Sequence, residues 1–295
     1  MITLSIVILN FNTRDVLRRL LLSLTPGLQK QWEIIVVDNH SSDGSQDMVE
    51  RDFTWVKLIR NRENRGFSAG NNIGLKKALG SYILLLNSDT EIPTTESLHS
   101  LLQTFEHNER VGMISPRVVF PSGQIDMACH RGFPSPWNAL MYFGGLEKVF
   151  GTIPLLNRIC GGYHQTWKSM YTKHDIDACT GAAMLVRSTA IDEVGLFDER
   201  FFMYGEDLDW CLRFKKAGWE IMYDPSCTVV HHKNVSGIRK EITSHEDIRV
   251  KKRAHAHFFD TMIQFYEKHY LSTYPTWLKH IVYFGIRSIK YMKGA

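Results

Sequence analysis

The chain has 295 residues, of which 44% are hydrophobic and 22% are charged, and its formal net charge at pH 7 is +4. This balance is that of a globular protein and excludes a disordered chain, while 21 glycines and 9 prolines are too few for a collagenous or low-complexity one. The charge is uneven, because residues 233–295 carry 12 Lys and Arg against 5 Asp and Glu. A basic C-terminal segment on a near-neutral body suggests contact with an anionic surface.

Several classes of protein do not fit this sequence. The longest apolar runs, such as residues 82–86, are far shorter than the ~20 residues that cross a bilayer. The first residues lack a basic region, so we expect no cleaved signal peptide and a cytoplasmic protein. The five cysteines are spread without a C-x-x-C pair, so we expect reduced, buried thiols. The sequence contains no nucleic-acid-binding motif, and we expect no nucleic acid partner.

Strand-like and helix-like patterns alternate in the first hundred residues. The patterns predict strands at residues 4–9, 33–37, 56–59 and 82–86, and helices at residues 15–24 and from Ser45 onward. Strands that are apolar on both faces and separated by helices are typical of a mostly parallel sheet. We therefore expect an α/β fold with a central sheet flanked by helices.

Polar residues follow three of these strands directly. Asn10 follows the first strand, Asp38 the second, and Asn87, Ser88 and Asp89 the fourth. Because ligands of parallel sheets bind at the carboxyl ends of the strands, these side chains are expected to converge on one site. The alternative is that each of them is an ordinary turn residue.

Gly66, Gly70 and Gly74 recur every four residues between the third and fourth strands. On a helix they lie on one face, where each glycine costs ~1 kcal/mol relative to alanine. Close packing against the sheet, or approach of a ligand to the bare backbone, would explain them. They do not form the G-x-G-x-x-G pattern of a nicotinamide-binding fold.

The second half of the chain is less regular. Residues 120–175 are rich in aromatic and turn residues, and we expect long connections and short helices that cover the mouth of the site. A strand at 182–186, a helix at 206–217 and a strand at 223–230 follow, and the last is followed by His231 and His232.

Several motifs, taken together and in this order, resemble family 2 inverting glycosyltransferases, and among them the rhamnosyltransferase-like branch. They are SIVILN (5–10), VVDN (36–39), NRGFSAGNNIG (64–74), LNSD (86–89), GLFDERFFMYGEDLDWCLR (195–213) and VHH (230–232). The resemblance covers roughly residues 3–270. It implies a GT-A type fold with a Rossmann-like, mostly parallel sheet.

The resemblance also implies a metal site. Transfer from a nucleoside diphosphate sugar needs stabilisation of the departing diphosphate, which Mg²⁺ or Mn²⁺ provides. The family's D-x-D motif reads Asn87-Ser88-Asp89 here, so Asp89 is expected to be the main carboxylate on the metal. Asn87 has lost the charge of the first position and is assigned to the sugar or ribose. His231 is expected to bind the metal or the diphosphate, in preference to His232.

The catalytic and nucleotide-binding residues follow from the same resemblance. Asp207 is expected to be the general base that accepts the proton of the acceptor hydroxyl. The alternative is that the acids of this segment only cap a helix. Glu206 and Trp210 are assigned to the acceptor side. Nucleotide-sugar binding is assigned to a set of strand-end and loop residues: Asn10, Asp38, Arg65, Asn87 and Ser88. Arg65 is equally well explained as a surface arginine paired with Glu63.

These expectations describe a metal-dependent inverting hexosyltransferase in bacterial surface polysaccharide synthesis. Its donor would be a dTDP- or UDP-sugar, with rhamnose as one candidate, and its acceptor a polyprenyl-linked or other saccharide. The alternatives are a non-catalytic module that binds sugar nucleotides and a sugar nucleotidyltransferase. The latter would need a Gly-rich loop with a basic residue after the first strand, which residues 10–14 do not provide.

We expect a glycosyltransferase domain at residues 1–240 and a helical C-terminal extension at 241–295. Apolar residues from Trp277 to Met292 fall at helical spacing, with Lys279, Arg287 and Lys290 expected on the other side. Such a helix is suited to the inner face of the cytoplasmic membrane, where the enzyme would be peripherally bound. Alternatively, the apolar face packs on the enzyme's own domain or on a second copy in a homodimer.

Overall fold

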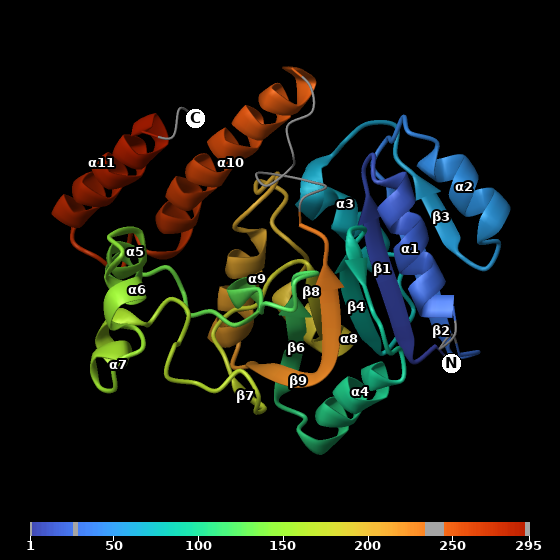
Figure 1. Cartoon of the computed structure of the whole chain (residues 1–295), viewed down its shortest axis with the longest axis horizontal. Coiled ribbons are helices and arrows are strands. Elements are labelled where there is room, and N and C mark those ends of the chain that lie inside the picture. Colours follow the sequence, from blue (N-terminus) through green and yellow to red (C-terminus); the bar gives the residue numbers. More distant parts are fainter. Residues whose placement is uncertain (1, 26–28, 234–244, 293–295) are drawn as a thin grey trace.

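The computed structural model describes residues 2–25, 29–233 and 245–292, which form one mixed β-sheet flanked by helices (Figure 1). The strand order is β3-β2-β1-β4-β8-β6-β9-β5, and β7 pairs with β9 beside this order. The strands are β1 (Leu4–Asn10), β2 (Trp32–Asp38), β3 (Lys57–Arg60), β4 (Tyr82–Asn87), β5 (Thr90–Glu91), β6 (Val111–Val119), β7 (His174–Asp175), β8 (Ala183–Arg187) and β9 (Glu220–His231).

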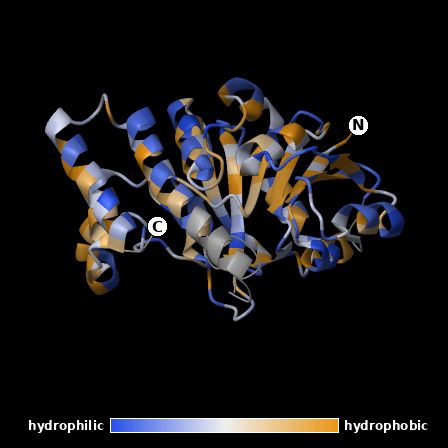
Figure 2. Cartoon of the chain, turned by 90° about the horizontal axis from the view of Figure 1, so that it is seen from above, coloured by the Kyte–Doolittle hydropathy of each residue, from blue (hydrophilic) through white to orange (hydrophobic). Residues whose placement is uncertain are grey.

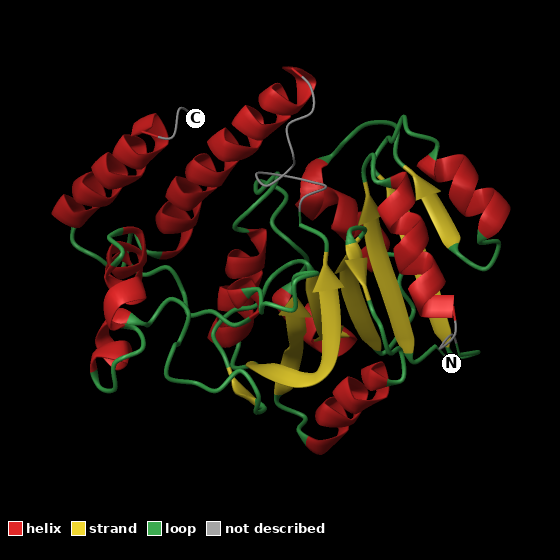
Figure 3. Ribbon diagram, viewed as in Figure 1, coloured by secondary structure: helices red, strands yellow, loops and turns green. Residues whose placement is uncertain are grey.

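Helices connect most of these strands and also follow the last one (Figure 3). They are α1 (Arg14–Leu24), α2 (Ser45–Asp52), α3 (Gly66–Leu75), α4 (Ser97–His107), a 3₁₀ turn (Met127–Cys129), α5 (Pro136–Phe143), α6 (Leu146–Phe150), α7 (Leu156–Cys160), α8 (Ser188–Val194), α9 (Glu206–Lys216), α10 (His245–His269) and α11 (Thr276–Met292). None of the helices in the described residues is long and apolar enough to span a bilayer.

The N-terminal part of the sheet is parallel, as the sequence predicts. β1 pairs with β2 and β4 in parallel, and β2 pairs with β3. The apolar side chains of β1 and β2 are buried on both faces of the sheet, which is why these strands read as continuous apolar runs. The other part is mixed, because β8 runs antiparallel to β4 and β6 while β9 runs parallel to β6.

The glycines of α3 bring this helix close to the sheet. A Cβ atom on Gly70 would lie 2.5 Å from Cδ1 of Leu9, and one on Gly74 would lie 2.4 Å from Cγ1 of Val7. Both distances are too short for a side chain, so the spacing of four residues serves close helix–sheet packing. This is one of the two explanations that the sequence leaves open.

The middle segment divides into two parts. Asp126 and Arg131 lie in the stretch that follows β6 and contact residues at the carboxyl edge of the sheet. Helices α5, α6 and α7 instead group at one end of the molecule near α11, and they do not cover the strand ends as the sequence suggested (Figure 1). All five cysteines are free and buried, as predicted.

The C-terminal extension is helical, as predicted, and forms the hairpin of α10 and α11 (Figure 1). The predicted domain boundary at 240/241 lies outside the described residues. The sequence placed Lys290 on the side opposite the apolar face, but this side chain binds Asp260 of α10 at 2.6 Å, and Ile286 is buried. The predicted two-sided pattern of α11 is therefore wrong at Lys290, which lies on the side that packs against α10.

Candidate active site

Three neighbouring strands end in the polar residues that the sequence predicts to meet. Asn10 ends β1, Asp38 ends β2 and Asn87 ends β4, and the register pairs Asn10 with Asp38 and Leu9 with Asn87. The Nδ2 atom of Asn10 donates a 2.7 Å hydrogen bond to Oδ2 of Asp38. These residues therefore share the carboxyl edge of the sheet, where α/β folds bind ligands.

A chain of hydrogen bonds extends from this pair to Ser88. The hydroxyl of Thr13 donates to Oδ1 of Asn10 at 2.6 Å, and Oγ of Ser88 lies 2.7 Å from Oγ of Thr13. Because the single Thr13 proton is used on Asn10, Ser88 is the donor in the second bond. Thr13 was missed because a threonine before a helix looks like an N-cap, but it makes no capping hydrogen bond.

Asp38 is fully buried and keeps room for one more donor. Its Oδ1 accepts hydrogen bonds from the backbone N of Ser41 at 2.8 Å and from Nε2 of Gln46 at 2.6 Å. With the bond from Asn10, three of the four acceptor positions of the carboxylate are filled by described residues. The fourth suits a hydroxyl group of a ligand.

Arg65 is at the surface beside this edge. Its side chain is about half exposed, and its Nε lies 3.9 Å from Oε1 of Glu63, which is the alternative arrangement that the sequence left open. The buried Asn39 accepts a hydrogen bond from the backbone N of Arg65 at 3.1 Å and donates one to Asn64 at 2.9 Å. Asn39, which follows Asp38, thus fastens the loop that carries Arg65 to the end of β2.

The pairing of β5 with β9 brings Asp89 to His231. Thr90 lies opposite His231 in the antiparallel register, and the Nε2 atom of His231 is 3.3 Å from Oδ1 of Asp89. His232 points to a different partner, because its Nε2 lies 3.3 Å from Oε2 of Glu91. The structure therefore places His231, and not its neighbour, against the acid of the Asn-Ser-Asp motif.

Asp126 and Lys233 complete this cluster, and the sequence gave no signal for Asp126. Oδ2 of Asp126 lies 3.6 Å from Nδ1 of His231 and 2.9 Å from Nζ of Lys233. Burial alone would raise the pKa of the Asp126 carboxyl, but the interactions with His231 and Lys233 lower it below its ordinary value. Burial would likewise lower the pKa of His231, but Asp126 and Asp89 raise it.

The donor atoms of this cluster partly fit a divalent cation. Asp89 and His231 offer a carboxylate and an imidazole, which Mn²⁺ accepts and, for the carboxylate above all, Mg²⁺ as well. The buried Nδ1 of His231 has no partner within hydrogen-bond distance among the described residues. No group of three or more His, Cys, Asp or Glu in this part of the chain is arranged to hold a metal by itself. A bound metal would therefore take most of its ligands from substrate and water.

Asp207 lies at the start of α9 and is held by a buried arginine. Its Oδ2 accepts hydrogen bonds from Nη2 of Arg131 at 2.7 Å and from the backbone N of Gly181 at 3.2 Å. Nη2 of Arg131 also donates to the carbonyl of Cys179 at 2.7 Å, which fixes the guanidinium between two elements. Arg131 belongs to the irregular middle of the chain, so sequence patterns did not reveal it.

Glu206, the residue before Asp207, is buried in a different environment. Burial and the nearby Asp207 carboxylate raise the pKa of Glu206 well above its ordinary value. The neutral form of Glu206 is therefore favoured more than that of an exposed glutamate, whereas Asp207 is paired with the guanidinium of Arg131. Two adjacent acids with environments that differ in this way are typical of acid–base sites.

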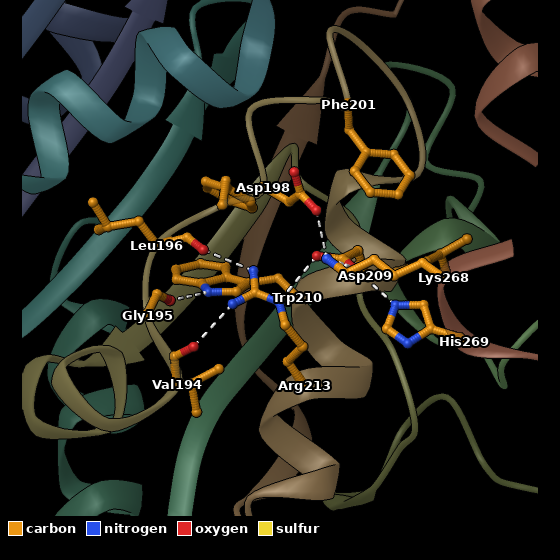
Figure 4. Close-up of polar contacts among 12 residues, drawn as sticks. Val194, Gly195, Leu196, Asp198, Phe201, Asp209, Trp210, Arg213, Lys268 and His269 are labelled. Atoms are coloured by element: carbon orange, nitrogen blue, oxygen red, sulfur yellow. Dashed lines mark hydrogen bonds and ion pairs between the residues drawn. The ribbon is translucent and has the colours of Figure 1, made fainter. Parts of the chain in front are cut away.

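Asp209 and Trp210, the next residues of interest on α9, make a different set of contacts (Figure 4). Asp209 is fully buried and interacts with Arg213 of its own helix and with Lys268 and His269 of α10. Trp210 is also fully buried, and its indole donates to the carbonyl of Gly195 at 2.8 Å. The expected contact of Trp210 with the acceptor is therefore not supported, because its ring belongs to the core.

Comparisons with known proteins agree with this geometry. The family model "Glycosyl transferase family 2" matches residues 5–168. N-acetylglucosaminyl-diphospho-decaprenol L-rhamnosyltransferase of Mycobacterium tuberculosis is 27% identical over 241 residues, which are 78% of this chain and 76% of that protein. A low-salt glycan biosynthesis hexosyltransferase of Haloferax volcanii is 27% identical over 242 residues, 81% of this chain and 70% of that one.

A solved structure shows that the fold is of the GT-A type. The mannosyltransferase of Pyrobaculum calidifontis, in complex with GDP-Man and Mn²⁺, superimposes with a TM-score of 0.57 at 14% identity, over 90% of this chain and 63% of that one. The family model covers more than half of the chain and spans the ends of β1, β2 and β4 as well as Asp126 and Arg131. The chain belongs to glycosyltransferase family 2, with rhamnosyltransferases among its relatives, and it is an enzyme that transfers a hexosyl group.

Proposed function

We propose that this enzyme transfers rhamnose from a dTDP- or UDP-linked donor to a polyprenyl-linked or other saccharide acceptor, with inversion at the sugar carbon. The position of the Asp207 carboxylate, which Arg131 and the backbone N of Gly181 hold at the start of α9, carries the proposal of an inverting mechanism. The sugar and the lipid-linked acceptor are supported by the name of the mycobacterial relative.

Asp207 is the proposed general base. Its carboxylate accepts the proton of the acceptor hydroxyl while the hydroxyl oxygen attacks the sugar carbon and the bond to the diphosphate breaks. Arg131 and the backbone N–H of Gly181 hold one oxygen of this carboxylate, so its orientation does not depend on the substrate. Glu206, whose pKa is raised by burial and by the neighbouring Asp207, is assigned to the acceptor side.

The donor is proposed to bind along the strand ends. Asp38, with one free acceptor position, is assigned to a hydroxyl of the ribose or to the base, and Asn10 orients it. Asn87 and Ser88 are assigned to the sugar or ribose. Arg65, half exposed beside Glu63, is assigned to the base or the diphosphate and would have to leave its present partner to reach either.

Asp89 and His231 are the proposed protein ligands of Mg²⁺ or Mn²⁺. When bound, the cation neutralises charge on the departing diphosphate. Asp126, which is itself paired with Lys233, lies on the other side of His231 with its Oδ2 atom 3.6 Å from Nδ1 of the imidazole. A sugar nucleotidyltransferase or a non-catalytic binding module is not favoured, because the family match is to sugar transfer.

We further propose that the enzyme works at the inner face of the cytoplasmic membrane, with the helices beyond residue 241 as a membrane-associating extension. Four side chains on the solvent side of α11 support this: Trp277, Ile281, Phe284 and Tyr291 are 63%, 59%, 76% and 87% exposed. They repeat at helical spacing and form one apolar stripe.

The test is a donor panel. The purified protein is mixed with dTDP-rhamnose, UDP-sugars and GDP-sugars, with Mg²⁺ or Mn²⁺, while thermal stability and release of the nucleoside diphosphate are followed. A donor that binds the native state raises the melting temperature, and we expect dTDP-rhamnose to do so and to be turned over with an acceptor. Turnover of GDP-sugars alone, or a product that retains the anomeric configuration, would contradict the proposal.

A further inference from the structure

Helices α5 to α7 carry an unusual concentration of exposed apolar side chains. In monomeric soluble proteins such residues are mostly scattered singly over the surface. Here ten large ones lie within a stretch of the chain shorter than α10: Trp137, Leu140, Tyr142, Phe143, Leu146, Val149, Ile153, Leu155, Leu156 and Ile159. We call this set the α5–α7 patch. A surface of this composition needs a partner that is itself apolar.

The charges around the patch point to an anionic partner. Between residues 132 and 174 the sequence holds a single acid, Glu147, and that side chain is buried against Nδ1 of His164 at 2.6 Å. Lys148 and Arg158 of the same segment are exposed. The exposed surface of residues 132–174 is therefore apolar and cationic with no exposed carboxylate of its own, which complements the acyl chains and headgroups of an anionic lipid surface.

Aromatic residues in the patch and beside it support the same partner. The indole N–H of Trp137 donates to the carbonyl of Ile159 at 2.9 Å, so the exposed ring needs no further polar contact. Arg158 lies over the ring of Trp167 with its guanidinium carbon 5.1 Å from the centroid. Aromatic rings beside cations are typical of groups that lie at the boundary between headgroups and hydrocarbon.

The helices of the patch lie at the same end of the molecule as α11. Two views at right angles place α11 and helices α5 to α7 at the same end, away from the parallel part of the sheet (Figures 1 and 2). The stripe cannot turn inward, because the opposite side of α11 is held by α10 through Tyr283 with Glu267 and Lys290 with Asp260. One end of the enzyme therefore presents apolar residues from two separate parts of the chain.

We propose that the α5–α7 patch is a second membrane-contact surface, which binds anionic lipid together with the stripe of α11. This proposal rests on the proposed function, because an enzyme with a lipid-linked acceptor has to work at the membrane surface. The helices are short, α6 and α7 having five residues each, and they lie in the interface without crossing it. Two contacts hold the enzyme in a fixed orientation on the bilayer, which one helix alone does not.

The experiment is sedimentation of the full chain with vesicles of 70% phosphatidylcholine and 30% phosphatidylglycerol, and with vesicles of phosphatidylcholine alone. The variant Leu140→Glu with Val149→Glu changes two patch residues that are 58% and 60% exposed. We expect at least about a tenfold weaker partition into the anionic vesicles, since two apolar side chains no longer leave water. The parent is expected to bind phosphatidylcholine alone more weakly than the anionic vesicles.

The matched control is Leu22→Glu with Leu79→Glu, which makes the same chemical change at residues that are 52% and 68% exposed, outside the patch. The control is expected to bind like the parent, and both variants should keep the parental melting temperature and its rise with added dTDP or UDP. Equal loss in the control, or binding of the patch variant within twofold of the parent, would overturn the proposal.

The alternative is that a second copy of the chain binds to this face. Light scattering without lipid tests this, because it measures the oligomeric state of the parent and of the patch variant. A parent that is dimeric, with a monomeric patch variant, would show that the patch is an interface between copies and overturn the lipid assignment. Vesicle binding is measured without donor or acceptor. Failure of sugar transfer with intact vesicle binding would therefore refute the proposed reaction and not the membrane surface.

Discussion

Oδ1 of Asp209 lies 2.7 Å from Nε2 of His269, a bond that joins the helix carrying Asp207 to the last turn of α10. Nζ of Lys268 is 2.6 Å from the same oxygen and 2.6 Å from Asp198 (Figure 4). Asp209 is fully buried, so α10 provides the partners that water would otherwise supply. The packing of α10 thereby fixes the start of α9, two residues from the proposed base.

The first prediction concerns the charge of Asp209. Burial would raise the pKa of this carboxyl, but His269, Lys268 and Arg213 lower it. Its contribution to stability is therefore present above the unfolded-state pKa of about 4 and is lost as the pH falls through the lower folded-state value. We expect Asp209→Asn to reduce the free energy of unfolding at pH 7 by about 3 kcal/mol, because its cationic partners stay buried.

Urea unfolding at pH 7 and at pH 3 checks this. The difference between parent and Asp209→Asn should shrink at the lower pH. Asp260→Asn is the control, because that carboxylate is 61% exposed beside Lys290 and its loss should cost less than about 1 kcal/mol. Equal stability of parent and Asp209→Asn at pH 7 would show that the buried cluster does not stabilise the fold.

The second prediction separates the two adjacent acids. Asp207→Asn removes the proposed base but keeps the size of the side chain, so turnover should fall roughly 100-fold or more with donor affinity nearly unchanged. Glu206→Gln keeps the size of the side chain and leaves Asp207 in place, so it should retain most of the turnover number. Steady-state kinetics with the donor found in the panel measure both. If the variants behave the other way round, Glu206 is the base.

The third prediction tests the metal site. Asp89→Ala should abolish the effect of Mg²⁺ or Mn²⁺ on donor affinity, measured by the shift in melting temperature that the nucleoside diphosphate causes with and without metal. Glu91→Ala is the control, because Glu91 contacts His232 and not His231. Full activity of the parent in excess EDTA would remove the cation from the mechanism and leave Asp89 as a sugar contact.

The fourth prediction uses two helical glycines with opposite surroundings. A Cβ at Gly74 would lie 2.4 Å from Val7, whereas one at Gly285 would meet nothing within 4 Å. Gly74→Ala should therefore destabilise the protein by about 1–3 kcal/mol through overpacking. Gly285→Ala should stabilise it by up to about 1 kcal/mol, because alanine is the better helix former. Chemical denaturation of both variants gives the sign, and a neutral Gly74→Ala would mean that α3 does not pack tightly on β1.

The sequence predicted the parts of the structure that local pattern controls. The parallel strands of the N-terminal half are apolar on both faces, and the polar residues that end them, Asn10 and Asp38, are in hydrogen-bond contact as expected. The placement of Asp89 beside His231 also followed from the motifs. Here each residue lies at the end of a strand, so its position follows from the strand itself.

The rest depends on contacts between distant segments. Arg131 and Asp126 lie in a stretch without periodicity, and only the tertiary fold brings them to Asp207 and His231. Trp210 was misassigned because a motif gives the order of residues but not which side of α9 each one faces. Lys290 was placed on the wrong side of α11 because the spacing of residues within one helix does not show that Asp260 of α10 lies close enough to form an ion pair with it.

The contacts of Asp209 with Lys268 and His269 make the start of α9 dependent on the end of α10. Proteolysis that removes the chain beyond residue 244 takes away Lys268 and His269 while leaving every residue at the strand ends in place. The buried carboxylate of Asp209, in the first turn of the helix that carries Asp207, would then keep Arg213 as its remaining described ion-pair partner. The proposed base thus depends for its support on residues 61 and 62 positions further along the chain, far from the strand ends.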